Sequence, residues 1–279
     1  MIVSKAAPAD FIAALDRACS RRTTTSAAGD IVWRIWGTGH PLVLLHGGTG
    51  SWLHWVRNIE ALSTSFMVTV PDLPGSGESG DLTPPVTAGH MAASLWSGLQ
   101  EIVGPQRFSV AGFSLGGLVA GHLGQIAGEH VDRLVLVGSG GMRLPRRPME
   151  PLKSWRWLSS EDAKRDIHRQ NLGILMIHDP RKVDELAVHI QFYNAPLSRV
   201  RGKHVVQASA MADCLPHVTA RVAGIWGEHD VTSPVELVAQ RLKEFLPQAT
   251  FDMIPGAGHW AQYEAADVFN RLLRARLGS

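Results

Sequence analysis

The sequence predicts an α/β fold in which a mostly parallel sheet is covered by helices on both faces. Short apolar runs of strand length alternate with longer segments of helical periodicity along most of the 279 residues. That alternation is typical of sheets built from strand–helix–strand units. Several apolar runs lead directly into glycine-rich loops. Functional groups of such sheets gather at the carboxyl ends of the strands, so these loops are expected to carry the site.

The expected elements follow from hydrophobic periodicity. The strands are short runs of apolar and β-branched residues, at 31–36, 41–46, 66–71, 108–111, 132–137, 222–226 and 249–254. The helices carry apolar residues at helical spacing, at 8–22, 52–65, 87–103, 115–126, 235–245 and 261–277. The polar stretch 23–30, which contains a glycine, is expected to be a loop.

The strand–helix rhythm is interrupted between residues 142 and 214. This segment begins with several prolines and continues with helical patterns and no clear strand. It is roughly 70 residues long, which exceeds an ordinary loop. We expect a helical lid over the site, inserted into a core formed by residues 1–141, with a short N-terminal helix, and 215–279.

Composition and charge exclude several classes of protein. With 45% hydrophobic and 19% charged residues, the chain can bury one large core. The net charge of +2 does not suggest a nucleic-acid surface, and the short cluster of Arg143, Arg146 and Arg147 is typical of a solvated loop. Cys19 and Cys214 are too few for a disulfide framework and lack metal-type spacing, which favours a reducing, cytoplasmic setting.

Neither a targeting segment nor a membrane span is expected. Charged residues such as Lys5 interrupt the first residues, so they do not resemble a signal peptide, and no apolar stretch approaches spanning length. No metal-ligand spacing or nucleotide loop is visible, so no metal and no cofactor are expected. The expected partner is a small-molecule acyl substrate, and assembly into a homodimer is left open.

Ser114 lies between an apolar strand and a helical run, in the pattern G-x-S-x-G formed with Gly112 and Gly116. A serine at such a strand-to-helix turn is held on a tight bend with its hydroxyl exposed. The flanking positions must be glycine because the two backbones approach closely. A glycine-rich turn without function is the alternative, but the strand before and the helix after it favour a nucleophile. Gly116 and Gly117 belong to this turn and do not form a phosphate-binding loop.

A second glycine loop follows the strand at 41–46. An acyl-transfer enzyme needs two N–H groups that stabilise the negative oxygen of a tetrahedral intermediate. We assign these to Gly48 and to Leu115, whose N–H lies at the positive end of a helix. Gly47 is expected to line the pocket, and His46 to be a structural hydrogen-bonding residue. A plain glycine turn is again the alternative.

The serine needs a base, and the base needs an acid that fixes its tautomer. His259 follows the last strand directly after a glycine, so its ring can extend over the edge of the sheet. Asp230 follows the strand at 222–226 and is the expected acid, although Glu228 of the same turn competes for the role. Asp72, which also follows a strand, is expected to be structural.

These motifs resemble the α/β-hydrolase fold superfamily over nearly the whole chain after residue 30, in which the triad also follows the order Ser, Asp, His. The residues that carry the resemblance are 46–48, 112–117, 227–230 and 258–259. The double glycine Gly47-Gly48 and the stretch from His259 to Asn270 are similar to the meta-cleavage product hydrolases, which cut carbon–carbon bonds in dienoate acids. That resemblance implies that Trp260 lines the pocket.

The chain departs from that subfamily at two points. Its glycine loop continues as Thr49-Gly50-Ser51 rather than with a Gly-Pro-Gly element. The subfamily also uses a lid arginine to bind the substrate carboxylate, for which Arg199 or Arg201 could serve. Haloalkane dehalogenases and epoxide hydrolases of this fold carry an aspartate at the turn, whereas this chain has Ser114, so the resemblance excludes both.

Three functions are compatible with these residues. The first is hydrolysis of a small carboxylic ester or related acyl substrate through an acyl-enzyme. The second is carbon–carbon bond hydrolysis of the meta-cleavage type by the same residues, and the third is a non-catalytic ligand-binding protein on this fold. In each case Trp155 and Trp157 of the lid are expected to shape the pocket.

Overall fold

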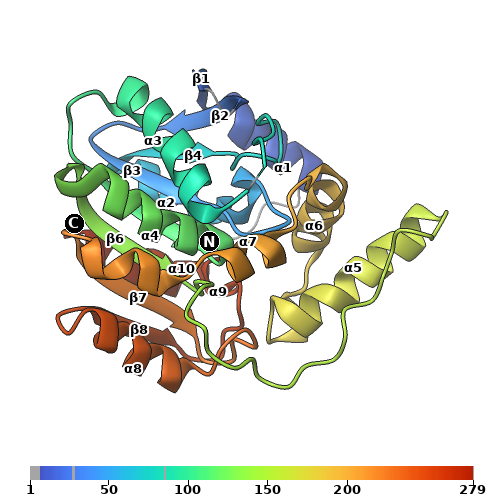
Figure 1. The fold of residues 1–279 in the computed structure, drawn as a ribbon. Coiled ribbons are helices and arrows are strands. Elements are labelled where there is room, and N and C mark those ends of the chain that lie inside the picture. The colour runs from blue at the N-terminus through green and yellow to red at the C-terminus, as the bar shows by residue number, and fades with distance from the viewer. Residues whose placement is uncertain (1–6, 27–28, 85, 279) are drawn as a thin grey trace.

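The computed structural model describes residues 7–26, 29–84 and 86–278. Within these ranges the chain forms one sheet of eight strands in the order β1-β2-β4-β3-β5-β6-β7-β8, with helices on both faces (Figure 1). The strands are β1 (Ser20–Ser26), β2 (Gly29–Trp36), β3 (His40–Leu45), β4 (Phe66–Pro71), β5 (Phe108–Phe113), β6 (Val131–Val137), β7 (Arg221–Gly227) and β8 (Thr250–Ile254). Strands β3 to β8 pair in parallel, whereas β1 and β2 join in antiparallel pairing. The predicted fold class is therefore confirmed.

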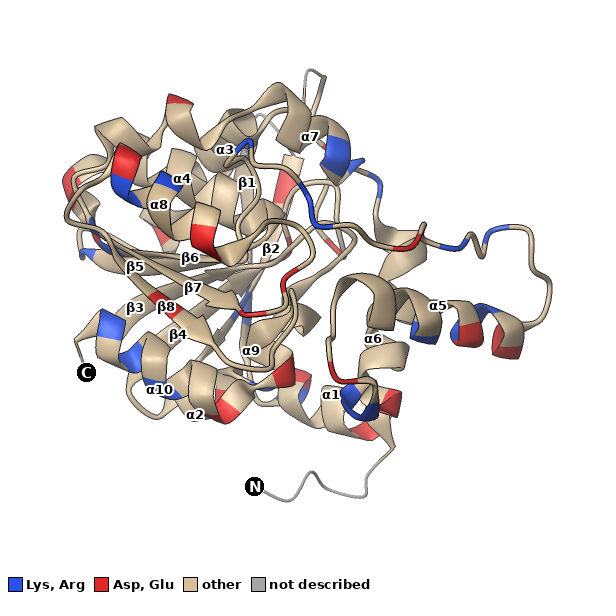
Figure 2. Ribbon diagram, turned by 90° about the horizontal axis from the view of Figure 1, so that it is seen from below, with Lys and Arg blue, Asp and Glu red and all other residues tan. Residues whose placement is uncertain are grey.

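The helices divide between the two faces of the sheet (Figure 2). One face is covered by α3 (Ala88–Val103), α4 (Leu115–Ala127) and α8 (Val235–Phe245), and the other by α2 (Ile59–Ser63) and α10 (Ala266–Leu277). The strands between them, such as β5, are buried along their whole length. Apolar residues on both faces explain why these strands read as continuous hydrophobic runs.

The expected N-terminal helix is too long, and the expected loop after it is wrong. Helix α1 (Pro8–Arg17) ends early, and the polar, threonine-rich stretch forms β1, which pairs with β2 at the edge of the sheet. An edge strand exposes one side to water, so it lacks the apolar signal on which the prediction depended. Among the residues of β1 whose burial the structure describes, Thr24 alone is buried in the core, where its hydroxyl accepts a hydrogen bond from Trp33 Nε1 at 2.8 Å.

Two further expected helices are interrupted. The stretch 52–65 consists of a 3₁₀ turn (Trp52–Trp55) followed by α2, and the C-terminal stretch consists of α9 (Ala261–Glu264) and α10. Ala265 separates the last two because its φ of −129° lies outside the helical range. This break points the last residue of α9, Glu264, into the interior, where it is 4% exposed.

The segment 142–214 contains α5 (Glu161–Leu175), α6 (Glu185–Leu197) and α7 (Gly202–Ala208), and no strand among its residues, all of which the structure describes. Helix α5 packs on α6 and projects away from the sheet, while α7 returns to α4 (Figure 1). Within the described part of the chain, no helix has the length and apolar character needed to cross a membrane. Residues 1–6, which bear on the expected lack of a signal peptide, lie outside that part.

Candidate active site

Ser114 occupies the turn between β5 and α4. Its φ of 53° and ψ of −113° are rare for a residue with a side chain, and such strain is typical of a nucleophile turn. Four backbone hydrogen bonds hold it there. The Ser114 N–H donates to Val137 O at 2.9 Å, and the Ser114 carbonyl accepts from Gly117 N at 3.1 Å, Gly140 N at 3.0 Å and Leu118 N at 3.4 Å.

The two flanking glycines are required by contact. A Cβ at position 112 would lie 2.2 Å from the Gly116 carbonyl oxygen, and a Cβ at position 116 would lie 2.4 Å from the His46 carbonyl oxygen. Both neighbours are backbone atoms that cannot move aside. In the pattern G-x-S-x-G, the first glycine is thus required by the tightness of the turn itself and the second by packing of the turn against the end of β3.

His259 and Asp230 meet Ser114 at the carboxyl end of the sheet. His259 Nε2 lies 3.1 Å from Ser114 Oγ, and His259 Nδ1 lies 2.8 Å from Asp230 Oδ2. The imidazole is 5% exposed and the carboxylate is fully buried. A carboxylate on Nδ1 favours the tautomer in which Nε2 is free to accept the serine proton.

The second oxygen of Asp230 is also fixed. Asp230 Oδ1 accepts hydrogen bonds from Thr232 N at 2.8 Å and from Thr232 Oγ1 at 2.7 Å. The competing acid, Glu228, is directed elsewhere: its Oε2 accepts from Gly256 N at 2.8 Å and its side chain is 41% exposed. Asp230, rather than Glu228, is therefore the acid beside the imidazole.

Gly48 and Leu115 lie next to each other in front of the serine. A Cβ at Gly48 would be 4.0 Å from Leu115 Cβ, so the two loops are in contact. Among the described residues neither the Gly48 N–H nor the Leu115 N–H has an acceptor. Gly47 adjoins the nucleophile, since a Cβ there would lie 3.2 Å from Ser114 Cβ. Two unused donors beside the serine are what an oxyanion hole requires.

Two buried histidines support the loop that carries Gly47 and Gly48, which we call the oxyanion loop. His46 Nδ1 lies 2.8 Å from Gly47 O, and His46 Nε2 accepts from Leu73 N at 2.8 Å. His54 Nδ1 accepts from Gly47 N at 3.2 Å. Burial lowers the pKa of His46 and lowers the pKa of His54 further, so both are neutral at pH 7. Asp72 is structural as expected, because it accepts from Trp52 N at 2.9 Å and contacts Arg34.

The loop that carries His259 is held by Glu264 and Trp260. The Glu264 carboxylate accepts three backbone N–H groups, from Gly258 at 2.7 Å, His178 at 3.0 Å and Asp179 at 2.8 Å. His178 and Asp179 belong to the connection between α5 and α6. The backbone N–H of Trp260 donates to the backbone carbonyl of Met176, in the same connection, at 2.7 Å. The histidine loop and the predicted lid are therefore joined.

A cavity of about 320 Å³ separates the oxyanion loop from the predicted lid. Its walls come from the Gly48–Thr49 loop, the stretch 152–156, α5 and α6. The polar side chains that line it are Thr49, Lys153, Ser154, Arg156, His168, Asn171 and Gln191. Gly48 is one of its walls, whereas Ser114, Leu115 and His259 do not line it.

The expected pocket residues are placed unequally. Trp155 lines the cavity, whereas Trp157 is 77% exposed and does not. Trp260 is fully buried beneath the site and donates from Nε1 to His54 O at 3.0 Å, so it supports the loop instead of lining the cavity. Arg199 is a further correction: it bonds to Asp81 Oδ1 at 2.6 Å on the outer surface. Arg201, the alternative, is exposed at the start of α7.

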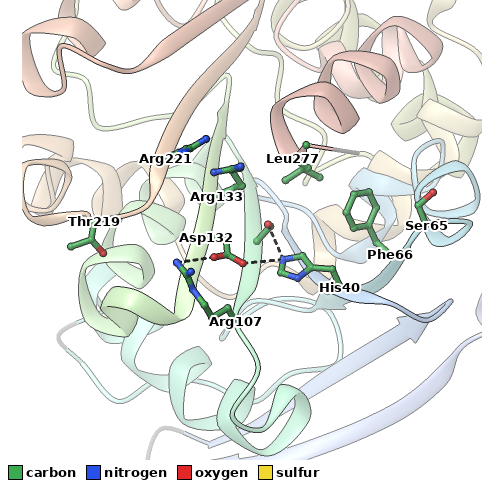
Figure 3. A pocket seen from close by; sticks show the side chains of 11 residues that line it. His40, Ser65, Phe66, Arg107, Asp132, Arg133, Thr219, Arg221 and Leu277 are labelled. Carbon is green, nitrogen blue, oxygen red and sulfur yellow. Dashed lines mark hydrogen bonds and ion pairs between the residues drawn. The ribbon is translucent and has the colours of Figure 1, made fainter.

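A second, larger hollow lies at the opposite edge of the sheet, where strands β3, β6 and β7 begin (Figure 3). Asp132 occupies its floor and bonds to Arg107 at 2.7 Å, with His40 Nε2 at 3.5 Å from its other oxygen. None of the groups around Ser114 contributes to it. The contacts of Asp132 join the beginnings of β3 and β6 and the residue directly before β5.

Sequence reasoning missed three residues that shape the site. Thr232 holds the acid, Glu264 holds the histidine loop, and Gly138 makes room for both. A Cβ at Gly138 would lie 3.1 Å from His259 Nδ1 and 3.2 Å from Asp230 Oδ2. The sequence carries two signals for these residues: the glycine-rich end of β6, and the stretch 231–234, which leads from Asp230 into a helix and is expected to hold that aspartate at the tip of its loop.

Most of the chain is similar in sequence or in fold to known hydrolases and esterases. Residues 40–266 match the family model for the alpha/beta hydrolase fold. The chain is 28% identical over 250 residues to a 2-hydroxy-6-oxo-6-phenylhexa-2,4-dienoate hydrolase of Burkholderia cepacia, with 85% of this chain and 87% of the relative covered. It is 31% identical over 229 residues to a pimeloyl-[acyl-carrier protein] methyl ester esterase of Vibrio vulnificus, with 78% and 86% covered. Among solved structures, a meta-cleavage product hydrolase from Pseudomonas fluorescens IP01 superimposes with a TM-score of 0.75 at 22% identity, over 92% of this chain and 97% of that one.

Proposed function

Because the chain belongs to the α/β-hydrolase fold family and its relatives are named as hydrolases and esterases, we propose that it cleaves a small carboxylic ester or related acyl compound through an acyl-enzyme on Ser114. The observation that carries this proposal is the continuous chain of hydrogen bonds from Ser114 Oγ through His259 to Asp230, at 3.1 and 2.8 Å. The esterase among the relatives supports it.

In this mechanism His259 Nε2 takes the proton of Ser114 while Oγ attacks the carbonyl carbon. The N–H groups of Gly48 and Leu115 stabilise the negative oxygen, each by a factor of about 10²–10³ in rate. His259 then gives its proton to the departing alcohol, which leaves an acyl group on Ser114. A water molecule, deprotonated by His259, attacks that ester, and the returning proton restores the serine as the acid is released.

A second function, hydrolysis of a carbon–carbon bond in a ring-fission dienoate, is favoured by the dienoate hydrolases among the relatives. It uses the same triad and oxyanion hole. Here Arg201 is the arginine we assign to the substrate carboxylate, since it precedes Gly202, whose added Cβ would lie 3.5 Å from Gly48 Cα.

The cysteines Cys19 and Cys214 are unpaired, which supports the proposed reducing, cytoplasmic setting.

The two functions are separated by relative kcat/KM. A panel of 4-nitrophenyl esters is compared with 2-hydroxy-6-oxo-6-phenylhexa-2,4-dienoate, for the wild-type protein, Ser114→Ala and Arg201→Gln. Ester hydrolysis that disappears in Ser114→Ala and is unchanged in Arg201→Gln supports the first function. A strong preference for the dienoate, lost in Arg201→Gln, supports the second. No turnover of either by the wild-type protein favours the non-catalytic alternative.

A further inference from the structure

The cavity beside the oxyanion loop contains two polar side chains that the proposed chemistry does not use. His168 of α5 is only 2% exposed, and Gln191 of α6 is partly buried; both line the cavity. Neither side chain has a hydrogen-bond partner among the residues that the structure describes, and neither belongs to the fully buried polar groups that lack one. Their polar atoms are therefore accessible from the cavity, where a ligand can supply the partner that the protein does not.

His168 is rigidly held and uncharged. Its ring packs against Trp155 at 5.2 Å and edge-on against Phe192 at 6.1 Å between centroids. Burial lowers the pKa of His168, so the imidazole is neutral at pH 7. A neutral imidazole offers one donor and one acceptor, and the Gln191 carboxamide also offers both.

The other polar groups of the cavity are engaged, exposed or uncharged. The Asn171 amide both donates to Lys153 O and accepts from Lys153 N, each at 2.8 Å, and so fixes the wall that carries Trp155. Thr49, Lys153 and Arg156 are exposed, and the partly buried Ser154 adds an uncharged hydroxyl. The interior of the cavity therefore presents neutral hydrogen-bonding groups between apolar walls, rather than a buried cation.

We propose that His168 and Gln191 form a specificity subsite for the remote end of the acyl substrate, and that this end carries an uncharged hydroxyl or phenol group. This inference rests on the proposed function. Gly48 is part of the cavity wall, whereas Ser114 and Leu115 are not, so the proposal requires the remote end of an acyl group bound at the Gly48 N–H to enter this cavity. A hydroxyl both donates and accepts, which matches the imidazole and the carboxamide, while a carboxylate would gain only one donor from a neutral histidine.

The test compares 4-nitrophenyl esters of ω-hydroxyalkanoic acids with the plain alkanoic esters over a series of chain lengths. At the best length the hydroxylated ester is expected to have a kcat/KM about tenfold higher, as one net hydrogen bond provides. His168→Phe is expected to bring this ratio close to one while hydrolysis of 4-nitrophenyl acetate is unchanged, and His168→Gln to keep part of it. His189→Phe is the matched control, because His189 also lies in the predicted lid, is partly buried and has a pKa lowered by burial, but does not line the cavity.

A ratio near one in the wild-type protein, or an unchanged ratio in His168→Phe, would overturn the subsite. A second measurement does not depend on turnover: calorimetry gives the affinity of the Ser114→Ala protein for a ω-hydroxyalkanoate and for the plain alkanoate. Preferential binding without any ester hydrolysis supports the subsite while the proposed function fails. Equal binding of the two acids contradicts the subsite, whether or not esters are hydrolysed. If His168→Phe does not fold, Gln191→Leu takes its place with the same expected loss of preference.

Discussion

Glu264 is expected to be the most sensitive residue outside the triad, because its carboxylate satisfies three buried N–H groups at once. In Glu264→Gln one oxygen becomes an NH₂ group, which cannot accept. If the remaining oxygen of the glutamine faces Gly258 and His178, the Asp179 N–H loses its acceptor. If that oxygen faces Asp179, the N–H groups of Gly258 and His178 lose theirs. At least one bond to a charged group is lost, each worth about 1.5–3 kcal/mol.

We therefore expect Glu264→Gln to lower the free energy of unfolding by about 2–3 kcal/mol. Because Gly258 directly precedes His259, kcat for 4-nitrophenyl acetate should also fall, by about tenfold, which is less than removal of a triad member costs. Urea denaturation with a constant m-value gives the first quantity, and steady-state kinetics at a temperature where the variant is folded gives the second.

Glu228→Gln is the matched control. Glu228 belongs to the neighbouring turn and accepts a single N–H, from Gly256, with its side chain 41% exposed. Its replacement should cost less than about 1 kcal/mol and leave kcat unchanged. A Glu264→Gln protein within about 0.5 kcal/mol of wild type, or one no more affected than Glu228→Gln, would refute the reasoning about the histidine loop.

Three other outcomes are expected. Asp230→Asn should keep the fold but lower kcat by about 10⁴, because the amide favours the wrong tautomer of the base; a near-normal kcat would contradict the assignment of the acid. The free energy of unfolding should fall as the pH drops below the ordinary histidine pKa of 6.5, by up to about 1.4 kcal/mol per pH unit for each of His46 and His54. The reason is that both imidazoles bind a proton in the unfolded chain but stay neutral in the folded protein. Urea titrations at successive pH values that show no loss of stability would contradict the neutral state of these two histidines. Asp132→Asn should lower stability by about 1 kcal/mol, the order of one partly exposed ion pair, without changing activity, and a change in kcat would link the opposite edge of the sheet to the site.

The parts of the site that sequence predicted are those fixed by local backbone chemistry. Ser114 was identified because a tight turn requires glycines on both sides, and the structure shows the two backbone contacts that impose them. Asp230 and His259 were identified because each follows a buried strand, and the carboxyl ends of parallel strands meet at one edge. The structure brings all three together.

The residues that sequence missed act through contacts between distant segments. Glu264 lies on a helix and carries no local signal that it reaches His178, which is 86 positions away. Arg199 shows the converse. It was expected in the pocket as one of two lid arginines, but the path of the chain takes its guanidinium to Asp81 on the outside. The sequence does not predict the edge strand β1, because most of its side chains face solvent and are polar, so that it lacks the apolar pattern of a buried strand.

We propose that Ser114 is a nucleophile activated by His259, and covalent labelling by a fluorophosphonate, followed by intact-mass measurement and peptide mapping, tests this most directly. We predict one phosphonyl adduct on Ser114 in the wild-type protein, strongly slowed labelling in His259→Ala, and none in Ser114→Ala. Absence of an adduct from the folded wild-type protein, or labelling at the same rate in all three proteins, would contradict the claim.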